Sequence, residues 1–345
     1  MKITFEELHK LCRSLMERAD VPEDAAKHVA DVLTTADARN IHSHGVMRLA
    51  FYIECIQSGG IRPQSELKIL DEGPAFLRVS ANGGLGIPAS CETVERLIAK
   101  GTGMPLAAAS VNHSDHYGPA GYYAMKCAEA GLIGFSMSNT CPLIAVTGAA
   151  AAGIGNNPFA YAAPAGKYRA VLFDVCMSVV ANGKLRLAAA DNHPIPEGWI
   201  LDKHGNPTTD PQTIYDGAIM LPFGGHKGYG LALMVEILSG VLANAGMLSG
   251  VHSWNTIPGQ DADTGHFFMT INPAFFGGLE NFTARMEKVI SELTSAPRAK
   301  GVDKIYYPGE LEFLSEQRAM KDGIDLPDIS SAELERAEKL LKQGK

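Results

Sequence analysis

A chain of 345 residues is too long for one small hydrophobic core and indicates two or three structural units. Hydrophobic residues make up 46% of the chain and charged residues 20%, so burial of apolar side chains can stabilise a globular fold without metal ions or disulfides. The formal net charge of -8 argues against a nucleic-acid partner, which would require a basic face.

The compartment is predicted from the N-terminal segment, the apolar runs and the cysteines. MKITFEELHK lacks the apolar core of a signal peptide, and the longest apolar run is interrupted by Glu236, Ser239 and Gly240 before it reaches the ~18 residues of a membrane span. The cysteines show no C-x-x-C spacing, which in a chain of this size indicates reduced, mostly buried thiols. They are Cys12, Cys55, Cys91, Cys127, Cys141 and Cys176. We therefore expect a cytoplasmic protein without a membrane partner.

The first sixty residues have helical periodicity. Thr4 and Glu7 have the spacing of a capping box at the start of an amphipathic helix. A second helix is predicted over residues 22–38, with Pro22 in its first turn, and a third over residues 45–56. The sequence thus begins with a helical part, which we assign to residues 1–66.

The period changes after this helical part. The pattern predicts a mixed α/β region over residues 67–225, followed by a helical region over residues 226–345. Residues 182–211 are rich in turn-forming residues and predict no long helix or strand. Strands are predicted at 67–70, 75–79, 106–111, 133–137, 159–164 and 170–174, and helices at 88–99, 119–130, about 228–245, and from Ser330 or Ser331 to Lys342.

One glycine motif suggests a dinucleotide-binding loop. Gly84-Leu-Gly86-Ile-Pro-Ala89 matches the G-x-G-x-x-A fingerprint of a Rossmann βαβ unit. Three residues separate the preceding strand from Gly84, and the next strand ends in Asn112 rather than in an acid that would hold the ribose. The context therefore favours a simple turn at the start of a helix.

Two histidine clusters are the candidates for chemistry. His42-Ser43-His44-Gly45 is followed by Arg48, one helical turn after His44. A guanidinium offers a planar fork to a substrate carboxylate, and an imidazole can give or take the proton of a hydroxyl or carbonyl oxygen. The second cluster, Asn112 to Gly118 with His113 and His116, follows a strand and precedes a helix, where α/β proteins commonly bind ligands.

Spacing alone leaves other interpretations of these clusters open. A histidine in a loop is more often structural than catalytic. His42, His44, His113 and His116 would form a metal site if they met, but the sequence contains no H-E-x-x-H or C-x-x-C pattern to support one. A serine hydrolase would need the G-x-S-x-G elbow, which is absent.

A series of ordered motifs nevertheless resembles the type-2 malate/lactate dehydrogenase family over nearly the whole chain. Members of this family include ureidoglycolate dehydrogenase, 2,3-diketogulonate reductase, sulfolactate dehydrogenase and cyclic-imine reductases. The matching segments are Ala36-Asp-Ala-Arg39, His42-Ser-His-Gly45 with Arg48, His116-Tyr-Gly118, Gly155-Asn-Asn-Pro158, Asp174, Gly183-Lys184, Ile195 to Trp199, Thr208 to Pro211, Gly224-Gly-His-Lys-Gly-Tyr-Gly230 and Tyr306 to Glu310. They are specific for the family and not for one substrate within it.

The resemblance implies a fold and an assembly. The expected fold class is α/β (α+β), in which a mixed, non-Rossmann sheet binds the nicotinamide cofactor and a helical domain is built from both chain termini. It also implies a homodimer whose active sites use residues of both subunits.

The resemblance also implies roles for individual residues. His44 and His116 fall on positions used for acid/base work, and Ser43, Arg48 and Tyr52 on substrate-side positions. The positions on the cofactor side are Thr140, Asp174, Val175, Cys176, Lys227, Pro308, Gly309 and Glu310. Without the resemblance, Asp174 would be interpreted as a strand-end cap and Lys227 as a solvated charge.

The implied function is that of an NAD- or NADP-dependent dehydrogenase or reductase acting on the CH–OH group of a small 2-hydroxy acid, without a metal. Departures from the family pattern at residues 146–149, 156 and 175–177 lie beside the expected nicotinamide pocket and leave the substrate open. The nearest alternative is a cyclic-imine reductase. Alternatives of other classes are a non-catalytic ligand-binding relative and a zinc-dependent hydrolase.

Overall fold

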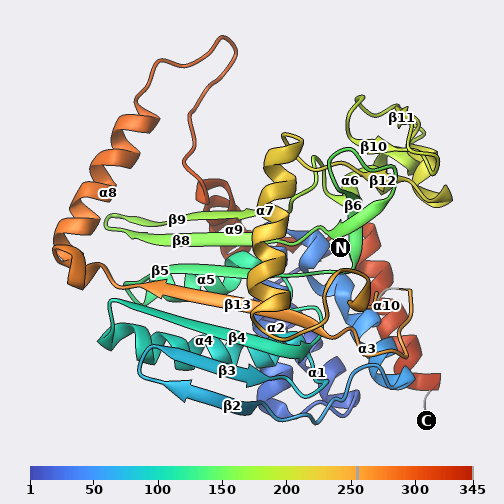
Figure 1. The fold of residues 1–345 in the computed structure, drawn as a ribbon, viewed down its shortest axis with the longest axis horizontal. Helices are drawn as coiled ribbons and strands as arrows, with labels where there is room; N and C mark the ends of the chain where they lie inside the picture. Colours follow the sequence, from blue (N-terminus) through green and yellow to red (C-terminus); the bar gives the residue numbers. More distant parts are fainter. Residues whose placement is uncertain (254–255, 344–345) are drawn as a thin grey trace.

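The structure is a computed structural model in which residues 1–253 and 256–343 are described (Figure 1). These residues are organised around a seven-stranded sheet with helices on both faces. A second sheet, of five short strands, forms a lobe at the upper right of Figure 1. The chain therefore has a mixed α/β fold, as the alternation of periods predicted.

The large sheet is mixed in strand direction. β3 and β4 run parallel, and the other neighbouring strands of this sheet run antiparallel. β13 comes from the C-terminal third of the chain and is inserted between β4 and β5. In order across the sheet, the strands are β2 (Lys68–Gly73), β3 (Phe76–Ser80), β4 (Leu106–Ser114), β13 (Thr264–Ile271), β5 (Ile133–Ser138), β8 (Phe159–Ala165) and β9 (Tyr168–Val175).

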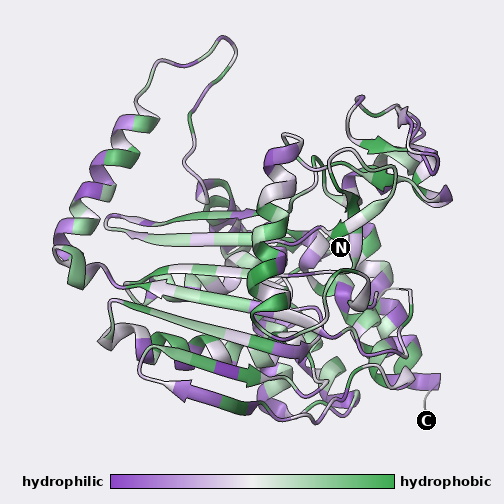
Figure 2. Cartoon of the chain, in the orientation of Figure 1, coloured by the Kyte–Doolittle hydropathy of each residue, from purple (hydrophilic) through white to green (hydrophobic). Residues whose placement is uncertain are grey.

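Helices cover both faces of this sheet. α4 (Gly86–Gly103) and α5 (Ala120–Glu129) lie behind it in Figure 1, and α7 (His226–Glu236) crosses its front and continues as a π-helical turn, η4 (Ile237–Val241). Figure 2 shows that the central strands and α7 are largely hydrophobic. The sheet thus buries side chains on both faces. Its strands therefore need apolar residues at successive positions rather than at alternate ones.

An aromatic cluster fills the space beneath the middle of the sheet. Phe268 of β13 is 0% exposed and packs edge-on against Tyr123 of α5, with ring centroids 5.5 Å apart. Tyr117 stacks on His266 with centroids 4.4 Å apart, and both rings are buried. The cluster joins β13, the end of β4 and α5, which are the elements that lead into the candidate site.

The two ends of the chain pack together. β1 (Lys2–Ile3) pairs antiparallel with β14 (Ile324–Asp325). α10 (Asp328–Gln343) packs against α3 (Leu49–Ser58) and α1 (Phe5–Arg18), while α9 (Glu310–Asp322) packs against α2 (Glu23–Ala38). N-terminal and C-terminal helices therefore lie side by side beside the sheet (Figure 1).

The smaller sheet shares its core with the large sheet and α7. Phe267 of β13 and Val235 of α7 are buried in one cluster with Ile144, Ile154 and Ile200 of the smaller sheet. Its elements are β11 (Pro207–Thr208), β10 (Ile200–Leu201), β12 (Ile219–Met220), β6 (Pro142–Ala145) and β7 (Ala152–Gly155), with α6 (Asn182–Ala190) and η3 (Pro211–Asp216) beside them.

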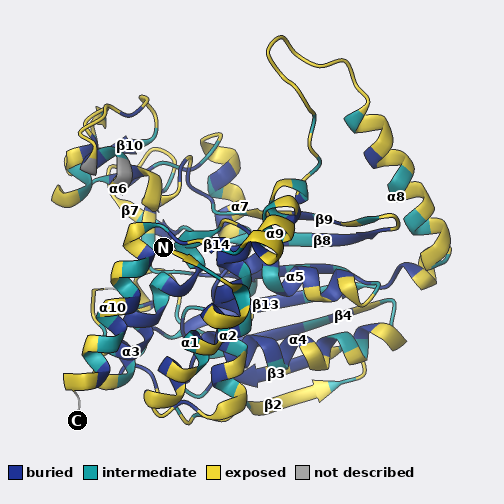
Figure 3. Cartoon of the chain, turned by 180° about the vertical axis from the view of Figure 1, so that it is seen from behind, coloured by how far each residue is buried: buried dark blue, intermediate teal, exposed yellow. Residues whose placement is uncertain are grey.

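α8 (Leu279–Thr294) and residues 295–306 project from the body of the molecule. Figure 3 shows this segment as mostly exposed. Its anchor includes Glu287, whose carboxylate accepts a hydrogen bond from the Lys167 amide at 2.7 Å. Shorter helical turns occur at η5 (Leu248–Gly250) and η6 (Pro273–Phe276). Among the described residues, none of the helices is long and apolar enough to cross a membrane.

Two predictions about helix starts are confirmed. Thr4 and Glu7 form the capping box: the Glu7 amide donates to Thr4 Oγ1 at 3.2 Å, and the Thr4 amide donates to Glu7 Oε2 at 3.1 Å. The glycine motif is the entry turn of α4, which begins at Gly86. A Cβ at Gly86 would lie 2.0 Å from the carbonyl oxygen of Asp115, so close packing explains this glycine.

The expectation that residues 182–211 contain no long helix or strand is wrong at its start. Residues 182–190 form α6, in which Leu185 and Ala189, four residues apart, are buried in the lobe. One pair at this spacing is too short a pattern to stand out among so many turn-forming residues. Three other helix boundaries in the structure also differ from those predicted from the sequence.

The three boundaries lie at the third helix, at the helix that crosses the sheet and at the last helix. The helix predicted from residue 45 begins at Leu49, after the 3-10 turns η1 (His42–His44) and η2 (Val46–Arg48). The helix predicted over 228–245 is divided between α7 and the π-helical turn. The last helix begins at Asp328, two residues before the expected caps.

The buried aromatic cluster predicts a large stability effect. Phe268→Ala should lower the free energy of unfolding by about 3–5 kcal/mol, because it removes a fully buried ring and leaves a cavity. Phe76→Ala, in a strand of the same sheet where the ring is 42% exposed, should cost less than half as much. Denaturant unfolding of both variants measures the difference. Equal losses would contradict the assigned core.

Candidate active site

A buried carboxylate anchors the turn between α2 and α3. Asp37 Oδ1 is 2.7 Å from His42 Nδ1, and its Oδ2 accepts a hydrogen bond from the Val46 amide at 2.8 Å. Gly45 lies against the same group, where a Cβ would come within 2.3 Å of the carboxylate. The turn closes in this form because residue 45 has no side chain.

Ser43, His44 and Arg48 are brought together on this turn. Ser43 Oγ is 2.9 Å from His44 Nδ1, and Arg48 Nε donates a hydrogen bond to the Ser43 carbonyl oxygen at 2.6 Å. The guanidinium also lies 6.0 Å from the centroid of the Phe51 ring. The predicted proximity of His44 and Arg48 is thus observed, although two 3-10 turns produce it rather than one α-helix.

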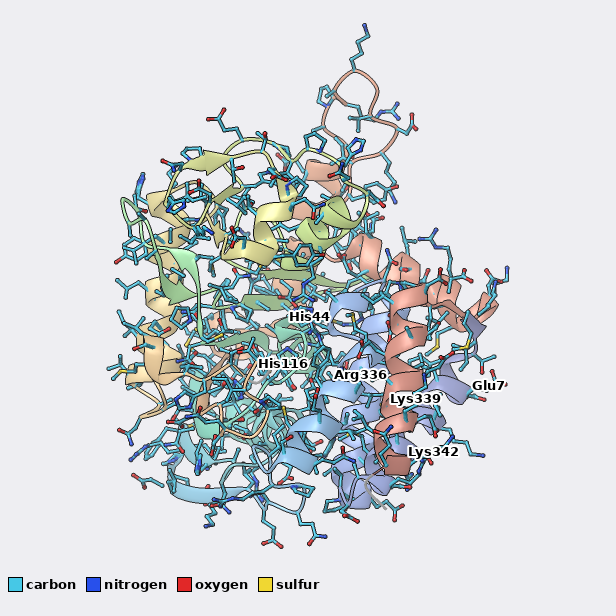
Figure 4. All side chains as sticks on the ribbon, turned by 90° about the vertical axis from the view of Figure 1, so that its right-hand side faces the viewer. Glu7, His44, His116, Arg336, Lys339 and Lys342 are labelled. Atoms are coloured by element: carbon cyan, nitrogen blue, oxygen red, sulfur yellow. The ribbon has the colours of Figure 1, made fainter. Side chains whose placement is uncertain are left out.

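The second histidine cluster meets the first. The rings of His44 and His116 are stacked, with centroids 5.7 Å apart and planes at 24°, and Figure 4 shows them near the helix that carries Arg336. Tyr52 of α3 places its hydroxyl oxygen 2.6 Å from His116 Nδ1. His113 does not join them and forms an ion pair with Asp261.

Backbone contacts fix His116 in this position. Its amide donates to Asp115 Oδ1 at 2.6 Å, and the Gly118 amide donates to His116 Nδ1 at 3.4 Å. Gly118 has φ +79°, a conformation that a side chain would strain, and a Cβ there would lie 2.9 Å from Val32 Cγ1. The glycine that follows the histidine is therefore part of the site.

Burial makes both imidazoles neutral at neutral pH. Burial and the charge of Arg48 lower the pKa of His44 to about 3. Burial, followed by the charges of Arg48 and His44, holds the pKa of His116 well below its ordinary value. Burial also raises the pKa of the Tyr52 phenol, which stays protonated. A neutral imidazole is suited to accept a proton from an alcohol that is being oxidised.

A cavity of about 240 Å³ lies beside His44. It brings together members of both predicted sets: Ser43 and His44 from the substrate side, and Asp174 and Cys176 from the cofactor side. Its other lining residues include Arg39, Gly118, Pro119, Ala120, Gly121, Tyr122, Pro158, Leu172 and Glu312. The cavity is thus enclosed by α2, by the start of α5 and by β9.

The predicted cofactor residues of β9 lie along this cavity or next to it. Asp174 Oδ2 accepts a hydrogen bond from the Gly121 amide at 2.7 Å, at the start of α5. Val175 pairs with Phe159 of β8. Cys176 Sγ is 3.4 Å from Ser178 Oγ. Asp174 therefore caps a helix as well as lining the cavity.

The segment of Pro308, Gly309 and Glu310 packs on the same strand. The Pro308 carbonyl oxygen accepts a hydrogen bond from the Leu172 amide at 3.0 Å. Gly309 has φ +93°, and a Cβ there would lie 2.8 Å from Leu172 Cβ. Glu310 forms an ion pair with Lys304. The segment thus borders the cavity through Leu172.

Of the predicted cofactor residues, Asp174 and Cys176 line the cavity, and the other six do not. Thr140 and Lys227 belong to these six. Thr140 Oγ1 accepts a hydrogen bond from the Asn156 amide at 2.9 Å, and the Thr140 amide donates to Asn157 Oδ1 at 3.0 Å. Lys227 is exposed in the first turn of α7. Both lie on the side of the molecule that carries the smaller sheet and α7.

Sequence reasoning missed two buried acids that organise these surroundings. One is Asp37. The other is Glu236, whose carboxylate accepts hydrogen bonds from Asn157 Nδ2 and from the Leu248 amide, each at 2.8 Å. The signal was present for Glu236, which occurs in an otherwise apolar helical stretch, where a charge needs a buried partner. Asp37 lies among polar residues, including Thr34, Thr35 and Arg39, and gave no such signal.

Metal ligands do not gather in the described part of the chain, where no group of three or more His, Cys, Asp or Glu side chains is placed to hold an ion.

The chain is similar in sequence and in fold to known proteins. The sequence profile described as malate/L-lactate dehydrogenase matches residues 3–335. A malate dehydrogenase of Pyrococcus abyssi is 38% identical over 333 residues, covering 94% of this chain and 91% of its own. The NAD(+)-dependent ureidoglycolate dehydrogenase of Escherichia coli is 34% identical over 328 residues, covering 95% and 93%. The crystal structure of a Δ1-piperideine-2-carboxylate reductase from Pseudomonas syringae superposes with a TM-score of 0.87 at 30% identity, covering 99% of both chains.

The chain belongs to the malate/L-lactate dehydrogenase family. The resemblance inferred from the motifs is therefore confirmed.

Asp115, beside His116, predicts a pH-dependent stability. Burial raises the pKa of this carboxyl to about 7, above its unfolded value of ~3.9, so the free energy of unfolding should fall as the pH rises between these values. Asp115→Asn keeps an oxygen for the His116 amide but cannot ionise. Its stability relative to the original chain should therefore rise by roughly 2–4 kcal/mol from pH 4 to pH 7. Denaturant unfolding across this range, with exposed Asp71→Asn as control, measures the effect. Parallel stability curves for the original chain and Asp115→Asn would contradict it.

Proposed function

We propose that this chain is an NAD(P)-dependent oxidoreductase that transfers a hydride between nicotinamide and a small 2-hydroxy or 2-oxo acid, of the kind represented by malate, lactate and ureidoglycolate. The observation that carries the proposal is the shared cavity, in which Ser43 and His44 meet Asp174 and Cys176. Membership of the malate/L-lactate dehydrogenase family supports the same reaction.

On the substrate side, Arg48 holds the carboxylate through its planar guanidinium. Its contact with the Ser43 carbonyl oxygen supports this role, because it ties the guanidinium to the turn that bears His44. Tyr52 contacts His116 rather than the cavity. His44 and His116 are the acid/base candidates, and the stacking of their rings, with centroids 5.7 Å apart, supports a shared role. Of these residues His44 lines the cavity, whereas His116 and Arg48 lie outside its lining.

On the cofactor side, the cavity fits one end of a dinucleotide. Its volume of about 240 Å³ is below the ~300–1,000 Å³ of most small-molecule sites, so it holds a ring and not a whole cofactor. Its lining of proline, alanine and leucine side chains beside the first amides of α5 suits a flat, partly charged ring. When bound, NAD or NADP supplies or accepts the hydride.

Asp174, Val175 and Cys176 would hold this end of the cofactor, and Pro308, Gly309 and Glu310 would close over it. Thr140 and Lys227 would bind a more distant part. The close packing of Gly309 on Leu172 supports the placement of the closing segment next to the cavity.

Three finer features belong to the proposal. The nicotinamide-binding sheet is of a non-Rossmann kind, which is supported by its single parallel pair, β3–β4. The domain division is residues 1–66, 67–225 and 226–345, and the pairing of β1 with β14 supports one helical domain built from both termini. The protein acts in the cytoplasm.

A cyclic-imine reductase is the nearest alternative, because one similar solved structure is that of a Δ1-piperideine-2-carboxylate reductase. Such an enzyme would use the same cofactor and would bind the substrate carboxylate through Arg48 in the same way, but it would reduce C=N instead of C=O. Hydroxy acids are favoured because the malate and ureidoglycolate dehydrogenases are more similar in sequence, at 38% and 34% identity.

The test of the function is a panel assay. Reduced-nicotinamide absorbance is followed with 2-oxo acids and cyclic imines, with and without EDTA. We expect oxidation of the cofactor with a 2-oxo acid that persists after chelation. Turnover with imines alone would establish the cyclic-imine reductase. The absence of any turnover would indicate the non-catalytic relative, and a hydrolysis that EDTA abolishes would indicate the zinc enzyme.

The role of Arg48 predicts a selective kinetic defect. Arg48→Lys should raise KM for carboxylate substrates strongly, because a point charge replaces a bidentate fork. Exposed Arg78→Lys is the matched control and should behave like the original chain. Steady-state kinetics with one acid measure both. Unchanged kinetics in Arg48→Lys and Arg48→Ala would remove Arg48 from the substrate site.

A homodimer is part of the proposal, and an apolar surface predicts where it forms. Ile237, Val241 and Leu242, on and after the π-helical turn, are 50%, 56% and 58% exposed. Burying such a patch against a second copy would stabilise the pair. Light scattering should therefore give a dimer for the original chain and for Ile69→Asp, but a shift toward monomer for Val241→Asp. A fully active monomeric original chain would contradict the shared assembly.

A further inference from the structure

The ring of His116 has two contacts at the same nitrogen. The Tyr52 hydroxyl oxygen lies 2.6 Å from Nδ1, and the backbone amide of Gly118 donates to Nδ1 at 3.4 Å. Tyr52 is fully buried on α3, and Gly118 belongs to the connection between β4 and α5. Two separate elements of the fold thus converge on one ring atom.

These contacts determine the tautomer of the ring. A backbone amide can only donate, so the Gly118 contact favours a lone pair rather than a proton on Nδ1. The Tyr52 hydroxyl, which can donate or accept, must then also donate to Nδ1. Because a neutral imidazole carries one proton, that proton is on Nε2.

The fold leaves little freedom to change this arrangement. Gly118 holds its amide in place through a left-handed backbone conformation, at φ +79°, that other residues rarely adopt. The backbone of His116 is tied to the buried Asp115 carboxylate at 2.6 Å. A different tautomer would leave the Gly118 amide facing an N–H group, at the cost of a repulsive contact inside the protein.

His44 differs from His116 in this respect. Its Nδ1 is 2.9 Å from Ser43 Oγ, and a serine hydroxyl rotates to donate or to accept. His44 can therefore carry its proton on either nitrogen and present the lone pair of the other nitrogen to a substrate hydroxyl. The two stacked histidines are thus inequivalent, one fixed and one free to exchange protons.

We propose that Tyr52 and Gly118 fix His116 as a neutral Nε2–H hydrogen-bond donor to the substrate oxygen, and that the proton of the reaction is exchanged with His44. The assignment rests on the proposed function. In the direction of oxidation, the C2–H bond breaks and its electron pair leaves with the hydride to NAD(P)⁺. The O–H bond gives its electrons to the new C=O bond, and its proton goes to the lone pair of His44. His116 keeps its proton throughout and stabilises the partial negative charge on the oxygen.

The alternative, proton donation by His116 itself, is unfavourable in this environment. Loss of the Nε2 proton would have to be balanced by transfer of the Tyr52 proton to Nδ1, which would leave a phenolate in the core. Burial raises the pKa of the Tyr52 phenol, so this phenolate is disfavoured. Tyr52 is therefore a positioning residue that acts through His116.

Nitrogen-15 NMR of the histidine-labelled, ligand-free chain tests the tautomer directly. At neutral pH the His116 resonances, assigned by their loss in His116→Gln, should show a bare Nδ1 and a protonated Nε2. In Tyr52→Phe the Nδ1 resonance should shift and the tautomers should mix. Tyr161→Phe, which removes a hydroxyl from β8, is the control and should leave it unchanged. A protonated Nδ1 in the original chain would overturn the assignment.

Kinetics test the division of roles. His116→Gln keeps an amide donor near the position of Nε2 and should lose less than about tenfold in kcat, whereas His116→Ala should lose ~10²–10³ and His44→Gln ~10²–10⁴. A loss in His116→Gln as large as that in His116→Ala would make His116 the proton-transfer group and overturn the proposal. If the NMR result holds but no acid is turned over, the tautomer assignment stands and the proposed function fails.

Discussion

The buried carboxylate of Asp37 is the contact on which the rest of the site depends. Its side chain is 0% exposed, and burying an ionised group is costly unless hydrogen bonds compensate for the lost hydration. Here His42 and the Val46 amide supply that compensation, so the turn must wrap around the acid. Burial raises the pKa of Asp37, and the contact with His42 opposes the shift. The positions of Ser43 and His44 follow from this closure.

The second half of the site depends on how distant segments converge on the large sheet. β13 enters between β4 and β5, so a strand from the C-terminal third of the chain supports the strand end that leads to His116. Asp174 caps the start of α5, which immediately follows Gly118. The cavity therefore lies where N-terminal helices, the β4–α5 connection and the end of β9 meet. A substrate bound there would contact several elements of the fold rather than a single loop.

Much of this could be predicted from the sequence, and the limits have physical causes. Hydrophobic periodicity located six of the seven strands of the large sheet, and the ordered motifs identified the family, because both are local signals. Periodicity missed β13, which lies in the region predicted to be helical, and the short strands of the smaller sheet. Asp37 and Glu236 were missed, since their roles depend on partners 5 to 9 and 12 to 79 residues away that periodicity does not reveal. α6 was missed because a single buried pair, Leu185 and Ala189, carries its amphipathic pattern.

A single measurement tests most directly whether nicotinamide and substrate meet in the cavity between His44 and Asp174. A crystal structure of the chain soaked with oxidised cofactor and a 2-oxo acid should show the ring between these residues. The acid's carboxylate should lie on Arg48 and its C2 oxygen within hydrogen-bond distance of His116 Nε2. A nicotinamide ring bound outside this cavity, or an acid without contact to Arg48, would contradict the account.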